Sequence, residues 1–223
     1  MLLLLFFFFK DYSLPEYERI VYQGYDKGTT REIVRDFYVK EDHYRVVQHH
    51  LDKTNLTMIV KISKKDFSTY SVYKKTENKE VYNLIKDEKG YIFRLNKGRW
   101  KKLKKKVIYD RHTLFEVFRF YPFSSKETIE FPLFEAKYGM VVKGVCKYEG
   151  EEVVETPMGK IRCYKIIFSI EKGIIGSIVK TLLKGREFQF FYEKESPHRL
   201  VYWTDKKDGY IIIKRIENSL DKE

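Results

Sequence analysis

The residue types best suited to catalysis or metal binding are few in this chain. It has five histidines and two cysteines, at His43, His49, His50, His112, His198, Cys146 and Cys163. His49 and His50 are adjacent in strand-like sequence, so their side chains point to opposite faces and cannot chelate one metal ion. The sequence contains no Cys-x-x-Cys pair, no Gly-x-Ser-x-Gly motif, no paired-carboxylate pattern and no phosphate-binding glycine loop. We therefore expect a protein without enzymatic activity, metal site or cofactor.

The two cysteines flank a tight turn at Thr156–Gly159 that joins two long strand-like segments. This turn places Cys163 opposite Glu152 and Cys146 opposite Ser169, and a one-residue bulge cannot align the two thiols. Because a strand rises about 3.3 Å per residue, the cysteines are separated by roughly 20 Å. A disulfide needs Cα atoms within about 7 Å, so we expect both thiols to stay free.

The densest positive charge lies between residues 97 and 106, in a chain of net charge +12. Its basic residues are Lys97, Arg99, Lys101, Lys102, Lys104, Lys105 and Lys106. The favoured interpretation is a solvated face or an edge strand, where lysines prevent edge-to-edge aggregation. Contact with an anionic membrane surface or lipopolysaccharide is the second interpretation. Nucleic-acid binding, with Trp100 as a stacking platform, is the least favoured of the three.

An apolar segment with a glycine at each end, residues 173–185, is the second candidate site. Ile174, Ile175, Ile178 and Leu182 fall on one face of a short helix. The segment is either a lid or membrane-contacting loop at the mouth of a cavity, or a helix that closes one end of a barrel.

A third candidate combines one short helix with two phenylalanines that follow it. Leu114, Phe115 and Phe118 have helical spacing, and Pro122 ends the helix. Together with Phe131 and Phe134, these side chains either line a lipid cavity or fill an ordinary core.

The rest of the sequence predicts a mainly β protein. Aromatic residues make up 17% of the chain, and Ala136 is its only alanine, which argues against a helical bundle. Turn signals recur every eight to twelve residues, as in sandwiches and barrels. The predicted strands cover about 19–25, 31–39, 43–51, 56–62, 70–73, 81–85, 91–95, 99–109, 138–154, 160–170, 188–192, 200–204 and 210–216. No linker divides residues 11–223, so we expect a single domain.

The first ten residues read as the end of a secretory signal peptide. Leu2–Phe9 is an apolar run, far shorter than the ~20 residues that span a bilayer. The alternatives are a packed N-terminal strand or a peripheral anchor. Abundant Lys and Glu with scarce Asn and Gln favour a thermophilic source.

The second half of the chain resembles a known bacterial family. The order Asp110, Leu114-Phe115, Phe131-Pro132-Leu133-Phe134, Glu155-Thr156-Pro157-Met158-Gly159, Cys163-Tyr164-Lys165 and Pro197-His198-Arg199-Leu200 resembles the domain of unknown function 3108 family. The resemblance covers roughly residues 105–217. It implies a curved antiparallel half-barrel with one helix on the concave side, similar to periplasmic lipoprotein carriers and exported to the periplasm or cell envelope. The apolar segment 173–185 adds a short helical insert to this expected fold. It implies no activity and no catalytic residues.

Three hypotheses for the function follow. The leading one is a non-enzymatic cell-envelope protein that binds an apolar ligand, above all a lipid, in a half-barrel cavity. The second is a structural or assembly protein of the envelope with a filled core, which binds protein or surface polymer. The third is nucleic-acid binding through residues 97–106. The presence or absence of a cavity discriminates between the first two.

Overall fold

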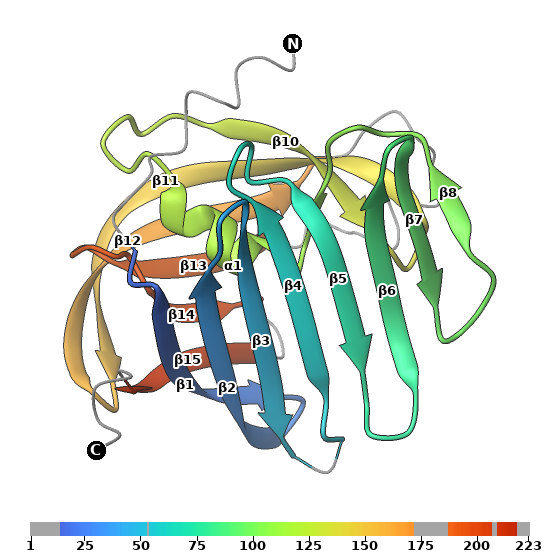
Figure 1. The fold of residues 1–223 in the computed structure, drawn as a ribbon. Helices are drawn as coiled ribbons and strands as arrows, with labels where there is room; N and C mark the ends of the chain where they lie inside the picture. Colours follow the sequence, from blue (N-terminus) through green and yellow to red (C-terminus); the bar gives the residue numbers. More distant parts are fainter. Residues whose placement is uncertain (1–13, 53, 172–186, 207–208, 218–223) are drawn as a thin grey trace.

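The computed structural model describes residues 14–52, 54–171, 187–206 and 209–217. These residues form one open sheet, strongly curved, with one helical segment on its concave side (Figure 1). The strands are β1 (Tyr17–Asp26), β2 (Thr29–Val39), β3 (His43–Leu51), β4 (Thr57–Ser63), β5 (Thr69–Lys75), β6 (Glu80–Asp87), β7 (Gly90–Leu95), β8 (Lys101–Leu103), β9 (Tyr109–Asp110), β10 (Ile129–Glu135), β11 (Met140–Thr156), β12 (Gly159–Ile170), β13 (Glu187–Glu193), β14 (Leu200–Thr204) and β15 (Gly209–Glu217). The helical segment comprises α1 (Leu114–Val117) and the 3₁₀ turn η2 (Phe118–Phe120).

The sheet consists of two antiparallel meanders joined along their first and last strands. Its spatial order is β8-β7-β6-β5-β4-β3-β2-β1-β15-β14-β13-β12-β11-β10-β9. The joining pair, β1 with β15, runs from Arg19 opposite Glu217 to Asp26 opposite Gly209. The one parallel pair among the described strands, β9 with β10, closes the second meander. The predicted half-barrel is therefore confirmed.

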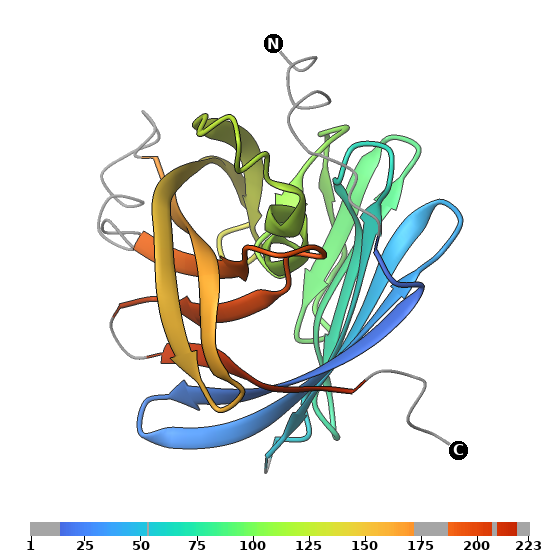
Figure 2. The same ribbon diagram turned by 90° about the vertical axis from the view of Figure 1, so that its left-hand side faces the viewer.

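The chain crosses from one edge of the sheet to the other through the concave side. It leaves the sheet at β8 and rejoins it at β9 on the opposite edge, and α1 and η2 then lie between the two meanders before β10 begins (Figure 2). Leu114, Phe118 and Phe120 are almost fully buried there. Because these side chains are apolar, the helical segment fills part of the hollow that the curvature of the sheet creates.

The main core lies under this segment and is dominated by aromatic side chains. Side chains alternate along β4, where Met58, Val60 and Ile62 share the buried face. Near the two edges of the sheet, the rings of Phe93 on β7 and Phe134 on β10 meet at 4.9 Å between centroids. None of the helices within the described residues is long and apolar enough to cross a membrane.

Two strand predictions were wrong. The strand expected over residues 99–109 is reduced to β8 and β9, because consecutive exposed lysines occupy an edge that has a partner on one side only. Strand β10 was not expected, although it carries Phe131 and Phe134. It contains Pro132, which lacks a backbone N–H, and its outer neighbour β9 pairs with only Leu133 and Phe134.

The predicted register around the two cysteines is confirmed at the turn and shifted by one residue beyond it. Cys163 lies opposite Glu152 as expected, whereas Cys146 lies opposite Phe168 instead of Ser169. The shift falls at Gly150, where a φ of 129° suits glycine. Both cysteines are buried and far apart along the hairpin.

We expect two free thiols per chain that react only after unfolding. Burial raises the pKa of Cys163 to about 12 and that of Cys146 well above its usual value, so little thiolate forms in the folded protein. Thiol titration without reductant at pH 8 should find almost none in the native protein and two in denaturant. A mass showing an intramolecular disulfide would mean that the β11–β12 register is wrong.

Candidate functional site

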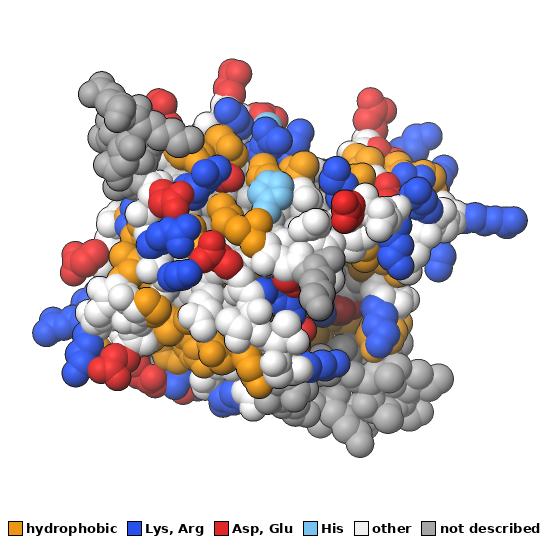
Figure 3. Space-filling view, turned by 90° about the horizontal axis from the view of Figure 1, so that it is seen from below, with side chains coloured by type: hydrophobic (Ala, Val, Ile, Leu, Met, Phe, Trp, Pro, Cys, Tyr) orange, Lys and Arg blue, Asp and Glu red, His pale blue; other side chains and the backbone are white. Residues whose placement is uncertain are grey.

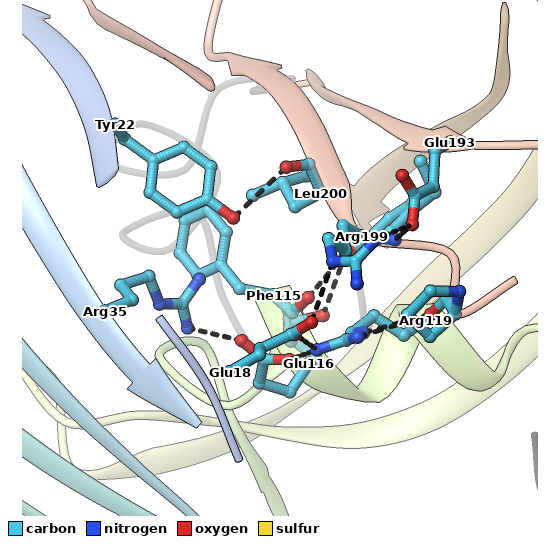
Figure 4. Close-up of polar contacts among 12 residues, drawn as sticks. Glu18, Tyr22, Arg35, Phe115, Glu116, Arg119, Glu193, Arg199 and Leu200 are labelled. Carbon is cyan, nitrogen blue, oxygen red and sulfur yellow. Dashed lines mark hydrogen bonds and ion pairs between the residues drawn. The ribbon is translucent and has the colours of Figure 1, made fainter. Parts of the chain in front are cut away.

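A buried ionic network fixes the helical segment inside the half-barrel (Figure 4). Arg119 lies at its centre, with Nη1 2.6 Å from Glu18 Oε1 and 3.1 Å from Glu116 Oε2. Both Arg119 and Glu18 are at most 2% exposed. The guanidinium also donates to the Pro197 carbonyl at 3.3 Å. One side chain therefore connects β1, the helical segment and the β13–β14 connection.

Two further arginines extend the network to its flanks. Arg199 lies 2.8 Å from Glu18 Oε2 and 3.0 Å from Glu193 Oε1. Arg35 on β2 lies 3.0 Å from Glu116 Oε1. Burial alone would raise the pKa of Glu18, but Arg119 and Arg199 together hold it below its usual value. The three cations and three carboxylates balance, as buried charges must.

The network also orients the ring of Phe115. The guanidinium of Arg35 lies 5.2 Å from the centroid of that ring. None of the guanidinium nitrogens of Arg35 makes a hydrogen bond within the described residues. Ion pairing with Glu116 and stacking on Phe115 therefore hold this side chain in place.

Beside Phe115 lies a cavity of about 380 Å³ within the concave face. Its wall comes from β1 to β5, the segment 111–115, β10 and β12 to β15. The exposed residues Tyr25 and Arg111 lie at its rim. Figure 3 views the lower end of the molecule, where basic and acidic side chains lie within a recess between hydrophobic surfaces.

One side of the cavity is an aromatic wall. Phe115, Phe168, Phe188, Phe190 and Trp203 line it. The rings touch one another: Phe115 lies 5.6 Å from Phe190 and 5.8 Å from Trp203, and Phe188 stacks on Trp203 at 6.1 Å. Such a wall accepts an apolar group by excluding water from a preformed surface.

The other side of the cavity is polar and carries His50, Lys74, Arg111 and His112. Burial, reinforced by Arg31, lowers the pKa of His50 to about 4. Burial, reinforced by Lys74, lowers the pKa of His112 well below its usual value. Burial together with Arg111 also lowers the pKa of Lys74. Each pKa is lowered by the same two causes, which are loss of solvation on burial and repulsion from neighbouring positive charges.

Only some of the residues that the sequence offered as ligand-binding candidates line the cavity. Leu114 and Phe115 line it, whereas Phe118, Phe131 and Phe134 do not. These three are buried in the core beside it, where Phe118 packs on Phe131 at 5.9 Å. Of the two alternatives stated for these three side chains, they take the position in the core. Ile174, Ile175, Ile178 and Leu182 lie outside the described residues.

The basic side chains of residues 97–106 are exposed and lie at the β8 edge of the sheet (Figure 1), and none of them lines the cavity. Trp100 is 42% exposed, but the guanidinium of Arg94 lies 4.5 Å from its centroid. One face of the indole is therefore already covered.

Sequence reasoning missed the polar side of the cavity and the ionic network. The polar residues come from separate elements, and only the packed sheet brings them together. A usable signal was present for the network, since Glu116 and Arg119 interrupt an otherwise apolar helix. Charged residues in such a context are buried as pairs.

Comparison with known proteins gives a fold and no family. No family model matches the chain, and no curated protein matches it. Membership of the domain of unknown function 3108 family therefore stays a prediction. A solved structure, a beta-barrel-like protein of domain of unknown function DUF1849 from Brucella abortus, aligns with a TM-score of 0.54 at 12% identity, covering 90% of this chain and 97% of that one. The two proteins share a fold.

Two further solved structures match more loosely. One is described as a candidate exported protein with a YmcC-like fold from Bacteroides fragilis, with a TM-score of 0.36, 12% identity and coverage of 95% of this chain and 99% of that one. The other is described as a candidate lipoprotein from Parabacteroides distasonis, with a TM-score of 0.35, 12% identity and coverage of 91% and 96%.

Removing the charge at the centre of the network should destabilise the fold. We expect Arg119→Met to lower the free energy of unfolding by about 3–5 kcal/mol, because it leaves the buried carboxylate of Glu18 without its main partner. Arg215→Met, at a side chain 45% exposed, should cost less than about 1 kcal/mol. Urea denaturation of both variants measures the difference, and equal effects would contradict the central role of Arg119.

His50 should remain neutral well below neutral pH. Its folded pKa is about 4, against about 6.5 in the unfolded chain. Its contribution to stability is therefore complete above pH 6.5 and is lost as the pH falls towards 4. The C2-proton resonance of His50, assigned with His50→Gln, should not move between pH 8 and 5.5. A titration midpoint near 6.5 would contradict the buried environment.

Proposed function

We propose that this protein is a non-enzymatic component of the bacterial cell envelope that binds an apolar or amphiphilic ligand, of the lipid class, in its half-barrel. The observation that carries the proposal is the cavity beside Phe115, with its continuous aromatic wall. Its volume of about 380 Å³ falls within the range of about 300–1,000 Å³ that ligand pockets occupy. At the lower end of that range, it suits a single short chain or a small amphiphile.

The aromatic wall supports ligand binding over the alternative of a filled core. A half-barrel can fill its hollow completely with side chains, and here the helical segment fills only part of it. Phe188 and Trp203 remain on the cavity wall. Two large rings facing an open space are costly unless the space is used, since they keep apolar surface in contact with water.

Nucleic-acid binding through residues 97–106 receives less support. The lysines there are exposed, but Trp100 is already covered on one face by Arg94. Contact of the same residues with an anionic membrane surface needs no stacking platform and fits the proposed location in the envelope. That location is a proposal in its own right, which fractionation of the source cell tests.

Ligand binding is tested with N-phenyl-1-naphthylamine, a neutral apolar probe that fluoresces on leaving water. In a Trp100→Phe background, Trp203 becomes the only tryptophan of the chain. Energy transfer from Trp203 to the probe then reports binding in the cavity. We expect saturable binding with one site per chain.

A cavity-filling variant provides the control. Leu56→Phe with Ile211→Phe adds volume on two sides of the cavity wall and should weaken probe binding about tenfold or more, equivalent to about 1.4 kcal/mol. Ile85→Phe with Val153→Phe makes the same change at exposed positions and should leave binding unchanged. Absence of binding, or equal loss in both variants, would refute the proposed function. Native mass spectrometry of the purified protein should also reveal a co-purifying lipid.

A further inference from the structure

We infer that the ligand carries an anionic oxyacid head group, a carboxylate or a phosphate, which Lys74 and His50 bind at the polar side of the cavity. This inference rests on the function proposed above and specifies the class of its ligand.

Lys74 is a cation without a direct partner among the residues that the structure describes. It lies on β5 and lines the cavity, and within the described residues its ammonium group makes no hydrogen bond and no ion pair. The carboxylate that acts on it, Asp110, is engaged elsewhere: Asp110 accepts the Tyr82 hydroxyl at 2.7 Å and the His112 backbone N–H at 2.8 Å. A partly buried ammonium in this situation gains most from an external anion.

His50 supplies a second free donor beside it. The Gln48 amide nitrogen lies 2.6 Å from His50 Nε2, and an amide NH₂ group can only donate. Nε2 is then the acceptor, and the proton of the neutral ring sits on Nδ1. Nδ1 is buried and has no hydrogen-bond partner in the part of the chain that the structure describes. An oxyanion would accept a hydrogen bond from this N–H group.

The acidic residues of the wall do not compensate these donors. Asp26 forms an ion pair with Arg31 at 3.3 Å. Asp205 accepts the Gly209 backbone N–H at 3.0 Å. Glu135 is buried on β10, and it is not among the groups that shift the pKa of Lys74. The wall therefore keeps its carboxylates occupied and leaves cationic and N–H donors open.

The lowered pKa values of Lys74, His50 and His112 agree with this reading. Each records the cost of holding positive charge in a crowded, partly desolvated place. A bound anion would favour the charged form of each group and so raise these pKa values. The donors also share one cavity with the aromatic wall, so head group and apolar tail are bound side by side.

A matched pair of probes tests the charge. 8-Anilino-1-naphthalenesulfonate has the ring system of N-phenyl-1-naphthylamine with one added anionic group. We expect Lys74→Met to weaken binding of the anionic probe about tenfold, the value of one charge-assisted hydrogen bond. Binding of the neutral probe should change less than about twofold. Lys160→Met, at a side chain 73% exposed on β12, removes the same charge and should affect neither probe.

The outcomes separate this inference from the function that it specifies. If neither probe binds the wild-type protein, the proposed function fails. If the neutral probe binds but Lys74→Met leaves the anionic probe unaffected, only the head-group inference fails. Should Lys74→Met not fold, the wild-type protein still decides: the anionic probe must raise the pKa of His50 in an NMR titration, and an unchanged value overturns the inference.

Three ligands with the same tail identify the head group. Decanoate, decyl phosphate and decanol are compared as competitors of the bound neutral probe. Competition by decanoate or decyl phosphate about tenfold better than by decanol supports the inference, and the better of the two names the oxyacid. Decanol competing equally well overturns it.

Discussion

The fold depends on one buried carboxylate, Glu18, and on the two arginines that neutralise it. Glu18 lies near the start of β1, Arg119 at the end of the helical segment, and Arg199 at the entry to β14. A sheet that is open at both edges has no ladder to hold its arms at a fixed separation. Here a charged link across the hollow performs that task, since an unpaired Glu18 in this place would be strongly unfavourable.

The same link determines the shape of the cavity. Glu116 and Arg119 hold the helical segment in the hollow, and the guanidinium of Arg35 stacks on the ring of Phe115. A hydrophobic contact could fill this space equally well but would leave the helix free to rotate. Hydrogen-bonded charges fix its orientation, so that Phe115 faces the cavity while Phe118 faces the core.

The features that the sequence predicted are those that depend on neighbouring residues. The β class and the turn before Gly159 follow from alternation and turn chemistry, whereas the single curved sheet was expected only from the family resemblance. Strand β10 was missed because Pro132 lacks a backbone N–H and argues against a strand, whereas a strand near the edge of a sheet tolerates it. The network could not be predicted by spacing, since Glu18 and Arg119 are separated by 101 residues. His50, Lys74 and His112 meet for the same reason, through packing of separate elements, and no local pattern encodes that.

The pairing of β1 with β15 governs how this molecule can be assembled. The strands β1 and β15, the first and last of the described strands, lie side by side at the centre of the sheet. During synthesis the N-terminal meander can form early, but its inner edge at β1 stays unpaired until the final strand emerges. Contacts of such long range form slowly, and an unpaired central edge invites pairing with another chain. The two meanders can therefore join only after β15 is released, and until then the free edge of β1 is prone to pairing with other chains.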